Sequence, residues 1–469
     1  MVAIYLLLAV PAIVWGIYLA LQSSLLNGLF TYLVLLCCFG EHFFELNIGI
    51  HLTLDRIFLG ALVATSLIQY WLGKITFRPL HRFDWLLLAF VGFLGLSTFT
   101  HNWRVSNPNE VPIVAHLVNG YLIPLALYFI ARNIDLRKES LTTFYYLLVG
   151  FGTYLAVVGL FEAFGLWTFV YPKYISDPEI GLHFGRSRGP MVHSVSFGIY
   201  LVICMSISWL LFCQKTKRWQ YIFLALIPLF LATIYFTKTR SVWIGAGSSL
   251  FFLFWMTLEG RVKYLTLGTM VTLALAVGVT KMDSIIGLKR EGTVQDTRKS
   301  TSMRASFTYV SWKMFKDRPV SGFGFGQFYR EKKPYLTDQQ SSLQLESIRS
   351  YVHHNTFLSL LTETGLIGLF LFLALVGSWT YSGWKLATRR NLSPWLKGQG
   401  LLLLATILTF TWQMLAHEIT FTPIDNSLLY IVSGLVVGTF LRQRFETVTP
   451  EKVLYSTYSV HTFGADIQN

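Results

Sequence analysis

The chain has 469 residues, of which 53% are hydrophobic and only 13% are charged, and its formal net charge is +14. A soluble domain usually carries about a quarter charged residues, so this composition excludes an ordinary soluble protein. The four cysteines lie in apolar runs and show neither a disulfide framework nor a zinc-binding spacing. We therefore expect an all-α polytopic membrane protein with no metal, no cofactor and no nucleic-acid partner.

Apolar segments recur along the chain, and thirteen of them are long enough, or nearly so, to cross a bilayer as helices. The first has no basic n-region and no cleavage site, so we expect a retained helix rather than a signal peptide. We predict a single membrane domain, residues 1–469. The number of spans is about twelve or thirteen, because no Lys or Arg precedes Arg56 and the positive-inside rule therefore does not determine the orientation of the first segments. The segments are 2–20, 25–39, 57–73, 84–99, 113–131, 142–163, 194–213, 219–236, 241–257, 263–280, 356–378, 398–416 and 424–441.

Short basic connections alternate along this series, so they all fall on one side of the membrane, which the positive-inside rule makes the cytoplasmic side. Residues 442–469 then form a cytoplasmic tail. The regions around Arg188, Lys238–Arg240 and His417 face outward, together with a long loop, 281–355. The basic connections are Lys74–Arg82, Arg132–Lys138, Lys215–Arg218, Arg261–Lys263, Lys385–Arg390 and Arg442–Arg444.

The long outer loop, 281–355, carries thirteen Lys and Arg against seven Asp and Glu. Long loops cross the membrane whatever their charge, but a basic excess could also bind an anion such as a phosphate carried on a lipid. The net charge does not decide between these two interpretations.

An amphipathic helix is predicted within this loop at about 302–318, lying along or near the membrane surface and ended by Pro319. Arg304 would stand in its first turn, where free backbone N–H groups also favour an anion. It could equally be a solvated helix residue. The apolar positions that recur with helical spacing are Met303, Phe307, Val310 and Met314.

Three glycines, Gly322, Gly324 and Gly326, follow this helix at every second position. They are not a dinucleotide-binding fingerprint, because no strand, turn and helix surround them. We interpret them as a flexible turn.

A histidine pair, His353 and His354, stands directly before the apolar segment 356–378. On a helix, Gly365 and Gly368 fall on the same face as His354, so a neighbouring helix could approach closely beneath it. Glu363 falls on about the opposite face and is poorly placed to orient His354. A histidine at a helix end could also be an interfacial residue that bonds the backbone.

His354-Asn355, followed after nine residues by Gly365-Leu-Ile-Gly368, resembles the histidine motif of the O-antigen ligase and O-antigen polymerase superfamily. His101-Asn102 also lies on an outer loop, but it fails the pattern because Pro112 stands where the first glycine belongs.

Three further segments are similar to motifs of the same family. The stretch from Arg304 to Gly324 resembles its arginine-led helix ending in Pro-x-x-Gly-x-Gly, and the segments 188–193 and 239–243 resemble two shorter arginine motifs. Two departures leave the subfamily open. Thr308 stands where the family often has an aromatic residue, and Thr239 stands where it usually has serine.

The resemblance implies a bacterial multi-pass transferase of the cytoplasmic membrane. Such an enzyme moves a glycan from undecaprenyl diphosphate to an acceptor sugar hydroxyl on the outer face. The donor is already activated, so the site needs a base and positive charge for the departing diphosphate. The implied partners are the undecaprenyl diphosphate-linked donor, a glycan or glycolipid acceptor, and membrane lipids. The implied site residues are His354 as base, Arg188, Arg240 and Arg304 on the diphosphate, and Asn355, Gly365 and Gly368 in support.

Several other polar residues near these motifs are weaker candidates. They are His183 and Arg186 for the cationic patch, His193 and His353 as alternative bases, and His417 with Glu418, which could orient the base or simply end a helix.

A ligase is our first interpretation, because of the histidine spacing. The alternatives are a polymerase that extends a lipid-linked glycan, a protein O-oligosaccharyltransferase, and a transporter of lipid-linked sugars. A transporter is expected to have ionisable or broken-helix sites near mid-membrane, and usually two matching halves. The predicted spans contain few ionisable residues, chiefly Glu162 and Glu363, which argues against transport.

Overall fold

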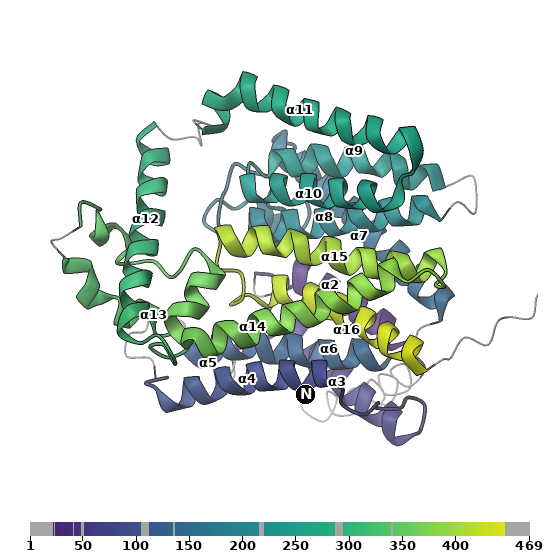
Figure 1. Cartoon of the computed structure of the whole chain (residues 1–469), viewed down its shortest axis with the longest axis horizontal. Helices are drawn as coiled ribbons and strands as arrows, with labels where there is room; N and C mark the ends of the chain where they lie inside the picture. Colours follow the sequence, from purple (N-terminus) through teal and green to yellow (C-terminus); the bar gives the residue numbers. More distant parts are fainter. Residues whose placement is uncertain are drawn as a thin grey trace, which may run out of the picture.

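The computed structural model describes residues 22, 24–40, 42–47, 51–104, 112–134, 137–214, 220–286, 294–338 and 341–445. The first predicted segment, 2–20, and most of the predicted tail, 442–469, lie outside the described residues. The described chain is almost wholly helical, and most helices run side by side in one bundle (Figure 1). The predicted all-α polytopic class is therefore confirmed.

Each predicted apolar segment from 25–39 onward coincides with a helix. The helices are α2 (Leu25–Cys38), α3 (Leu54–Trp71), α4 (Arg82–Thr100), α5 (Ile113–Leu117), a π-helical turn (Val118–Leu122), α6 (Ile123–Asn133), α7 (Lys138–Ala163), α8 (Ser194–Cys213), α9 (Gln220–Phe236), α10 (Arg240–Thr257), α11 (Gly260–Ile286), α12 (Val294–Asp317), α13 (Phe328–Glu331), α14 (Thr356–Thr388), α15 (Pro394–Ala416) and α16 (Pro423–Phe445).

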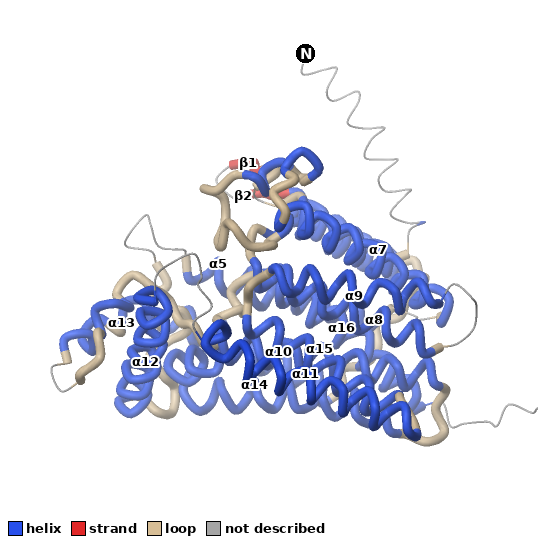
Figure 2. Tube along the Cα trace, turned by 90° about the horizontal axis from the view of Figure 1, so that it is seen from above, coloured by secondary structure: helices blue, strands red, loops and turns tan. Residues whose placement is uncertain are grey.

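Among the described residues, seven helices are long and apolar enough to cross a membrane by length and composition. The predicted twelve or thirteen spans are therefore not confirmed as a number. The seven are Arg82–Thr100, Ile113–Asn133, Lys138–Ala163, Ser194–Cys213, Thr356–Thr388, Pro394–Ala416 and Pro423–Arg442. One element was not predicted: a short antiparallel hairpin, β1 (Glu45–Asn47) with β2 (His51–Thr53), which joins α2 to α3 beside the bundle (Figure 2).

Small residues bring the bundle helices close together. A Cβ atom at Gly434 of α16 would lie 2.5 Å from the Tyr128 carbonyl oxygen of α6, and one at Gly400 of α15 would lie 2.3 Å from the Gly383 carbonyl oxygen of α14. Without a strong hydrophobic force between helices in lipid, such close backbone approach is a main source of association.

Four of the predicted basic connections lie next to helix ends that contact one another, those of α4, α6, α14 and α16. Buried Arg132 pairs with Asp84 at 2.7 Å and donates to the Pro79 carbonyl at 2.8 Å. Phe83 packs near Tyr381 and Phe440, with ring centroids 6.3 Å apart in both cases. The ends of α4, α6, α14 and α16 are thus neighbours, as the alternation of basic connections requires.

Helix α12 runs across the ends of the bundle helices in Figure 1, and Figure 2 also places it at that end. It ends at Asp317, just before Pro319, but it begins at Val294, earlier than predicted. Arg304 therefore lies in the helix interior, and the argument from the free N–H groups of a first turn is wrong. The reason is that residues 294–301 belong to the helix but have no apolar residues at helical spacing, so their sequence does not predict a helix.

The apolar face of α12 is predicted to lie along or near the membrane surface, but in the structure it packs against the protein itself. The loop that follows folds back over it and forms a second, small core. This loop core consists of Phe307, Val310, Met314, Phe323, Phe328, Leu336, Leu345 and Ile348.

Helix α14 is broken at Gly365, which has φ +63° and ψ −160°. The loop after α12 fills the break. Phe323 N and Gly324 N donate to the carbonyls of Thr362 (3.1 Å) and Glu363 (2.8 Å). In return, the amides of Leu366 and Ile367 donate to the carbonyls of Pro319 (2.9 Å) and Val320 (3.3 Å).

This exchange corrects two predictions. Gly365 admits a loop rather than a neighbouring helix, since a Cβ atom there would lie 2.3 Å from the Val320 carbonyl oxygen. The glycine-rich stretch is not a loose turn, because Gly322, Gly324 and Gly326 all have positive φ and the amides of Phe323, Gly324 and Gly326 donate to α14. Gly368, one turn further, faces Phe93 of α4.

Candidate functional site

His354 lies just before α14 and not on it. Asn355 is the N-cap, because its Oδ1 accepts from Leu358 N at 2.9 Å, while its Nδ2 donates to the Leu415 carbonyl at 2.8 Å. The partly exposed ring of His354 packs edge-on against Phe307 of α12, with centroids 5.0 Å apart. The helical-wheel argument for His354 is therefore wrong. Asn355 ties this end of α14 to the end of α15.

His353 has a different environment from its neighbour. Its side chain is buried, at 2% exposure, and its ring lies 3.5 Å from that of Phe328. Neither ring nitrogen has a hydrogen-bond partner within the described part of the chain. Burial, and then the nearby charge of Lys332, holds the pKa of His353 well below its ordinary value. His353 thus packs against the loop core, and its burial argues against a role as an alternative base.

His417, directly after α15, lies at the centre of the site. Its Nε2 is 3.3 Å from Ser241 Oγ, and its carbonyl accepts from Thr356 Oγ1 at 3.1 Å. Burial, followed by the nearby positive charges of His193, Arg304 and His354, lowers its pKa to about 3. His417 is therefore neutral at physiological pH, and segments far apart in sequence surround it.

The other histidines of this group stand before α8. The His183 and His193 rings stack with centroids 5.5 Å apart, and His183 Nδ1 lies 2.9 Å from Ser194 Oγ. We call His183, His193, His354 and His417 the histidine cluster.

Two of the three predicted arginines border the histidine cluster. Arg304 is exposed on α12, and its charge acts on His417. Arg240 is the exposed first residue of α10, next to Ser241, which bonds His417. Positive charge from two chain regions thus surrounds this group.

Arg188 is placed differently. Its side chain is fully buried, its Nε lies 3.4 Å from Glu162 Oε1, and its Nη2 donates to the carbonyls of Ile175 (3.0 Å) and Asp177 (2.8 Å). Its Nη1 donates to a further carbonyl, that of Ile180. The guanidinium is already used by the protein, which argues against the predicted contact with diphosphate.

Two glutamates have roles that sequence reasoning missed or left open. Buried Glu363 accepts from the amides of Gly326 (2.9 Å) and Phe328 (3.3 Å), so it holds the glycine-rich loop in the α14 break. Its place as an acid in an apolar span, between the histidine and the glycines of the motif, was the available signal. Glu418 accepts from Thr420 N at 3.0 Å and from Thr356 Oγ1 at 3.4 Å, and burial raises its pKa. It holds the turn that carries His417.

Within the described ranges, no group of three or more His, Cys, Asp or Glu side chains could hold a metal ion. The fold and the site together define a polytopic helical membrane protein with a cationic, histidine-lined site at one end of its bundle.

A family model described as O-antigen ligase matches residues 225–373 of this chain. The matched part includes Arg240, Arg304, His354, Gly365 and Gly368, which carried the resemblance. The match supports the O-antigen ligase superfamily, as predicted, and glycan transfer of the ligase or polymerase type in general. No curated protein matches this chain.

Proposed function

We propose that this protein transfers a glycan from undecaprenyl diphosphate to an acceptor sugar hydroxyl on the outer face of the bacterial cytoplasmic membrane. The observation that carries the proposal is the arrangement around His417, whose Nε2 lies 3.3 Å from the hydroxyl of Ser241, the residue beside Arg240, and whose pKa is lowered by burial and by nearby groups that include Arg304 and His354. The proposed base and the two proposed diphosphate ligands come from separate regions of the chain, and their position around His417 supports the proposal.

The chemistry follows from these groups. The acceptor oxygen attacks the anomeric carbon of the donor sugar, the bond from that carbon to the diphosphate breaks, and His354 takes the hydroxyl proton. Arg240 and Arg304 stabilise the charge of the departing diphosphate through paired N–H donors. Arg188 positions the outer loop between α7 and α8 and does not touch the donor.

The break in helix α14 is a feature that would suit a transporter. Discontinuous helices in transporters expose backbone groups to a substrate site. Here the groups freed at Gly365 are bonded to the loop after α12 instead, so the break supports a fixed scaffold. Transport therefore has no supporting observation. Ligase, polymerase and protein transferase differ only in the acceptor, and product analysis with each acceptor class separates them.

The test is transfer by purified His354→Ala protein given lipid-linked glycan and candidate acceptors. Loss of a general base is expected to lower the rate by about 10²–10⁴, with little change in melting temperature because the side chain is partly exposed. Val352→Ala is a matched control, since Val352 is an exposed neighbour. Near-normal transfer by His354→Ala would defeat the assignment of the base.

A further inference from the structure

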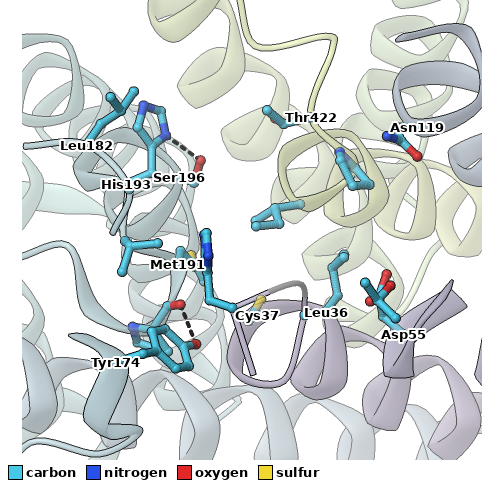
Figure 3. A pocket seen from close by; sticks show the side chains of 18 of the residues that line it. Leu36, Cys37, Asp55, Asn119, Tyr174, Leu182, Met191, His193, Ser196 and Thr422 are labelled. Atoms are coloured by element: carbon cyan, nitrogen blue, oxygen red, sulfur yellow. Dashed lines mark hydrogen bonds between the residues drawn. The ribbon is translucent and has the colours of Figure 1, made fainter. Parts of the chain in front are cut away.

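A separate cavity of about 280 Å³ lies beside the histidine cluster, between the end of α2, the start of α3, the turn before α8 and the start of α16. Figure 3 shows Asp55 and Asn119 on one side of it and His193 with Ser196 on the other. This volume is near the lower end of the range of roughly 300–1,000 Å³ for small-molecule sites.

The polar groups on one side are mixed in charge. Arg56 Nη2 donates to Asn119 Oδ1 at 3.4 Å, and the carboxyl group of Asp55, which is 4% exposed, stands next to it in the chain. The Thr53 hydroxyl is also buried and finds no hydrogen-bond partner in the part of the chain that the structure describes. A buried hydroxyl without a partner costs free energy, which a ligand in the cavity would recover.

His193 on the other side is held by a chain of hydrogen bonds. Ser196 Oγ donates to Asp425 Oδ2 at 3.0 Å, and His193 Nδ1 lies 2.8 Å from the same serine oxygen. Because the serine hydrogen goes to the carboxyl group, Nδ1 must be the donor to Ser196. The other ring nitrogen, Nε2, is then left as an acceptor.

The cavity shares one residue, His193, with the histidine cluster. His193 lines it, and the same residue stacks on His183 and contributes to the lowered pKa of His417. A ligand in the cavity would therefore have His193 between itself and the site of Arg304 and His354.

We propose that this cavity binds a sugar residue of the acceptor, with His193 as a positioning residue that accepts a hydrogen bond from a sugar hydroxyl. A sugar hydroxyl both donates and accepts, which suits a lining with a carboxyl group, a guanidinium, an amide and a hydroxyl. Apolar side chains such as Leu36, Met191 and Ile424 suit the C–H faces of a ring. The carboxyl group of Asp55 disfavours a phosphate. The acceptor role rests on the proposed function, whereas sugar binding does not.

The test measures, by saturation-transfer NMR, whether methyl glycosides of glucose, galactose, mannose and N-acetylglucosamine bind to the purified protein. Leu182 lines the cavity but is 61% exposed, so Leu182→Trp should block its rim without disturbing the core. Leu166→Trp, at an exposed leucine of the same outer loop outside the lining, is the matched control.

We expect at least one glycoside to bind the parent protein, with Kd raised about tenfold or more by Leu182→Trp and unchanged by Leu166→Trp. Absence of binding by every glycoside, equal binding by both tryptophan variants, or displacement of the glycoside by inorganic phosphate would each overturn the proposal. His354→Ala should bind the glycoside normally. Failure of the proposed transfer would therefore leave this binding result intact, and the two proposals can fail separately.

Discussion

The described parts of the α7–α8 loop and of the α12–α14 loop each contain one buried basic residue, and the two side chains are held differently. Between α7 and α8, Arg188 is fully buried, pairs with Glu162 and donates to three backbone carbonyls. Between α12 and α14, buried Lys332 donates to the carbonyls of Ile348 and Tyr351, and no carboxyl group pairs with it among the described residues.

The comparison separates two uses of basic side chains in these loops, holding the backbone and binding a ligand. A buried cation that donates to several carbonyls fixes the path of the backbone, and it is then unsuited to a ligand. Arg304, in the same region of chain as Lys332, is exposed at the histidine cluster. Burial, and not residue type or motif, separates the cation that builds a loop from the one that we assign to the diphosphate.

The largest effect is expected from Arg188→Ala. It leaves Glu162 as a buried charge without its partner, and loss of one partner of such a pair typically costs about 3–5 kcal/mol. We expect a large fall in melting temperature or failure to purify, measured by thermal denaturation in detergent. Arg186→Ala, in the same loop but half-buried, should change stability far less. A stable Arg188→Ala protein that loses only transfer would restore the predicted diphosphate contact.

His353→Ala should have the next largest effect. Removing a buried ring that packs on Phe328 leaves a cavity, at a cost of about 2–4 kcal/mol. His353→Phe keeps an aromatic ring in contact with Phe328, and the histidine nitrogens have no described partner, so that variant should retain transfer and most of the melting temperature that His353→Ala loses. Loss of transfer by a stable His353→Phe protein would make His353 part of the chemistry.

Arg304→Ala should show the opposite pattern to Arg188→Ala. A lost charge-assisted hydrogen bond costs about 1.5–3 kcal/mol, or roughly 10–150-fold in transfer rate, while an exposed side chain has little effect on stability. Arg304→Lys should also lose much of the rate, because lysine lacks the planar fork. Lys316→Ala, exposed on the same helix, is the control. We expect transfer to persist in excess chelator, and restoration of activity by a divalent cation would contradict this account.

The smallest effect is a pH dependence of stability from Lys332. Burial lowers the pKa of Lys332 to about 7, from an ordinary value of 10.5. Between these values the unfolded chain binds more protons than the folded one, so stability rises with pH, by at most about 1.4 kcal/mol per pH unit. The parent protein should therefore gain more melting temperature from pH 7 to pH 9 than Lys332→Met. Equal gains would show that Lys332 is charged when folded.

Hydropathy predicted the helices well, because a span must satisfy its backbone within itself and therefore appears in sequence as one apolar run. The motif resemblance likewise singled out His354 and Arg304, whose roles stay predictions. Both signals are local, and each depends on residues that lie near one another in the chain.

The remainder depends on contacts between distant segments. Arg188 and Arg304 look alike in sequence, and only the approach of Glu162 shows that the first is internal. His353 and His354 are adjacent, and only the loop core decides which of them is buried. Gly365 suits close packing by a helix or by a loop equally well, so the break in α14 had no separate signal.

That break has a consequence for how the protein assembles. An isolated α14 would enter lipid with unbonded backbone groups near Gly365, which is costly in a medium without water. The amides of Leu366 and Ile367 find hydrogen-bond acceptors only when the loop after α12 docks, and the amides of that loop donate to carbonyls of α14 in return. The two segments therefore form one cooperative unit. Their amide protons should exchange with solvent together, and the last spans reach their final shape only after the outer loop has folded.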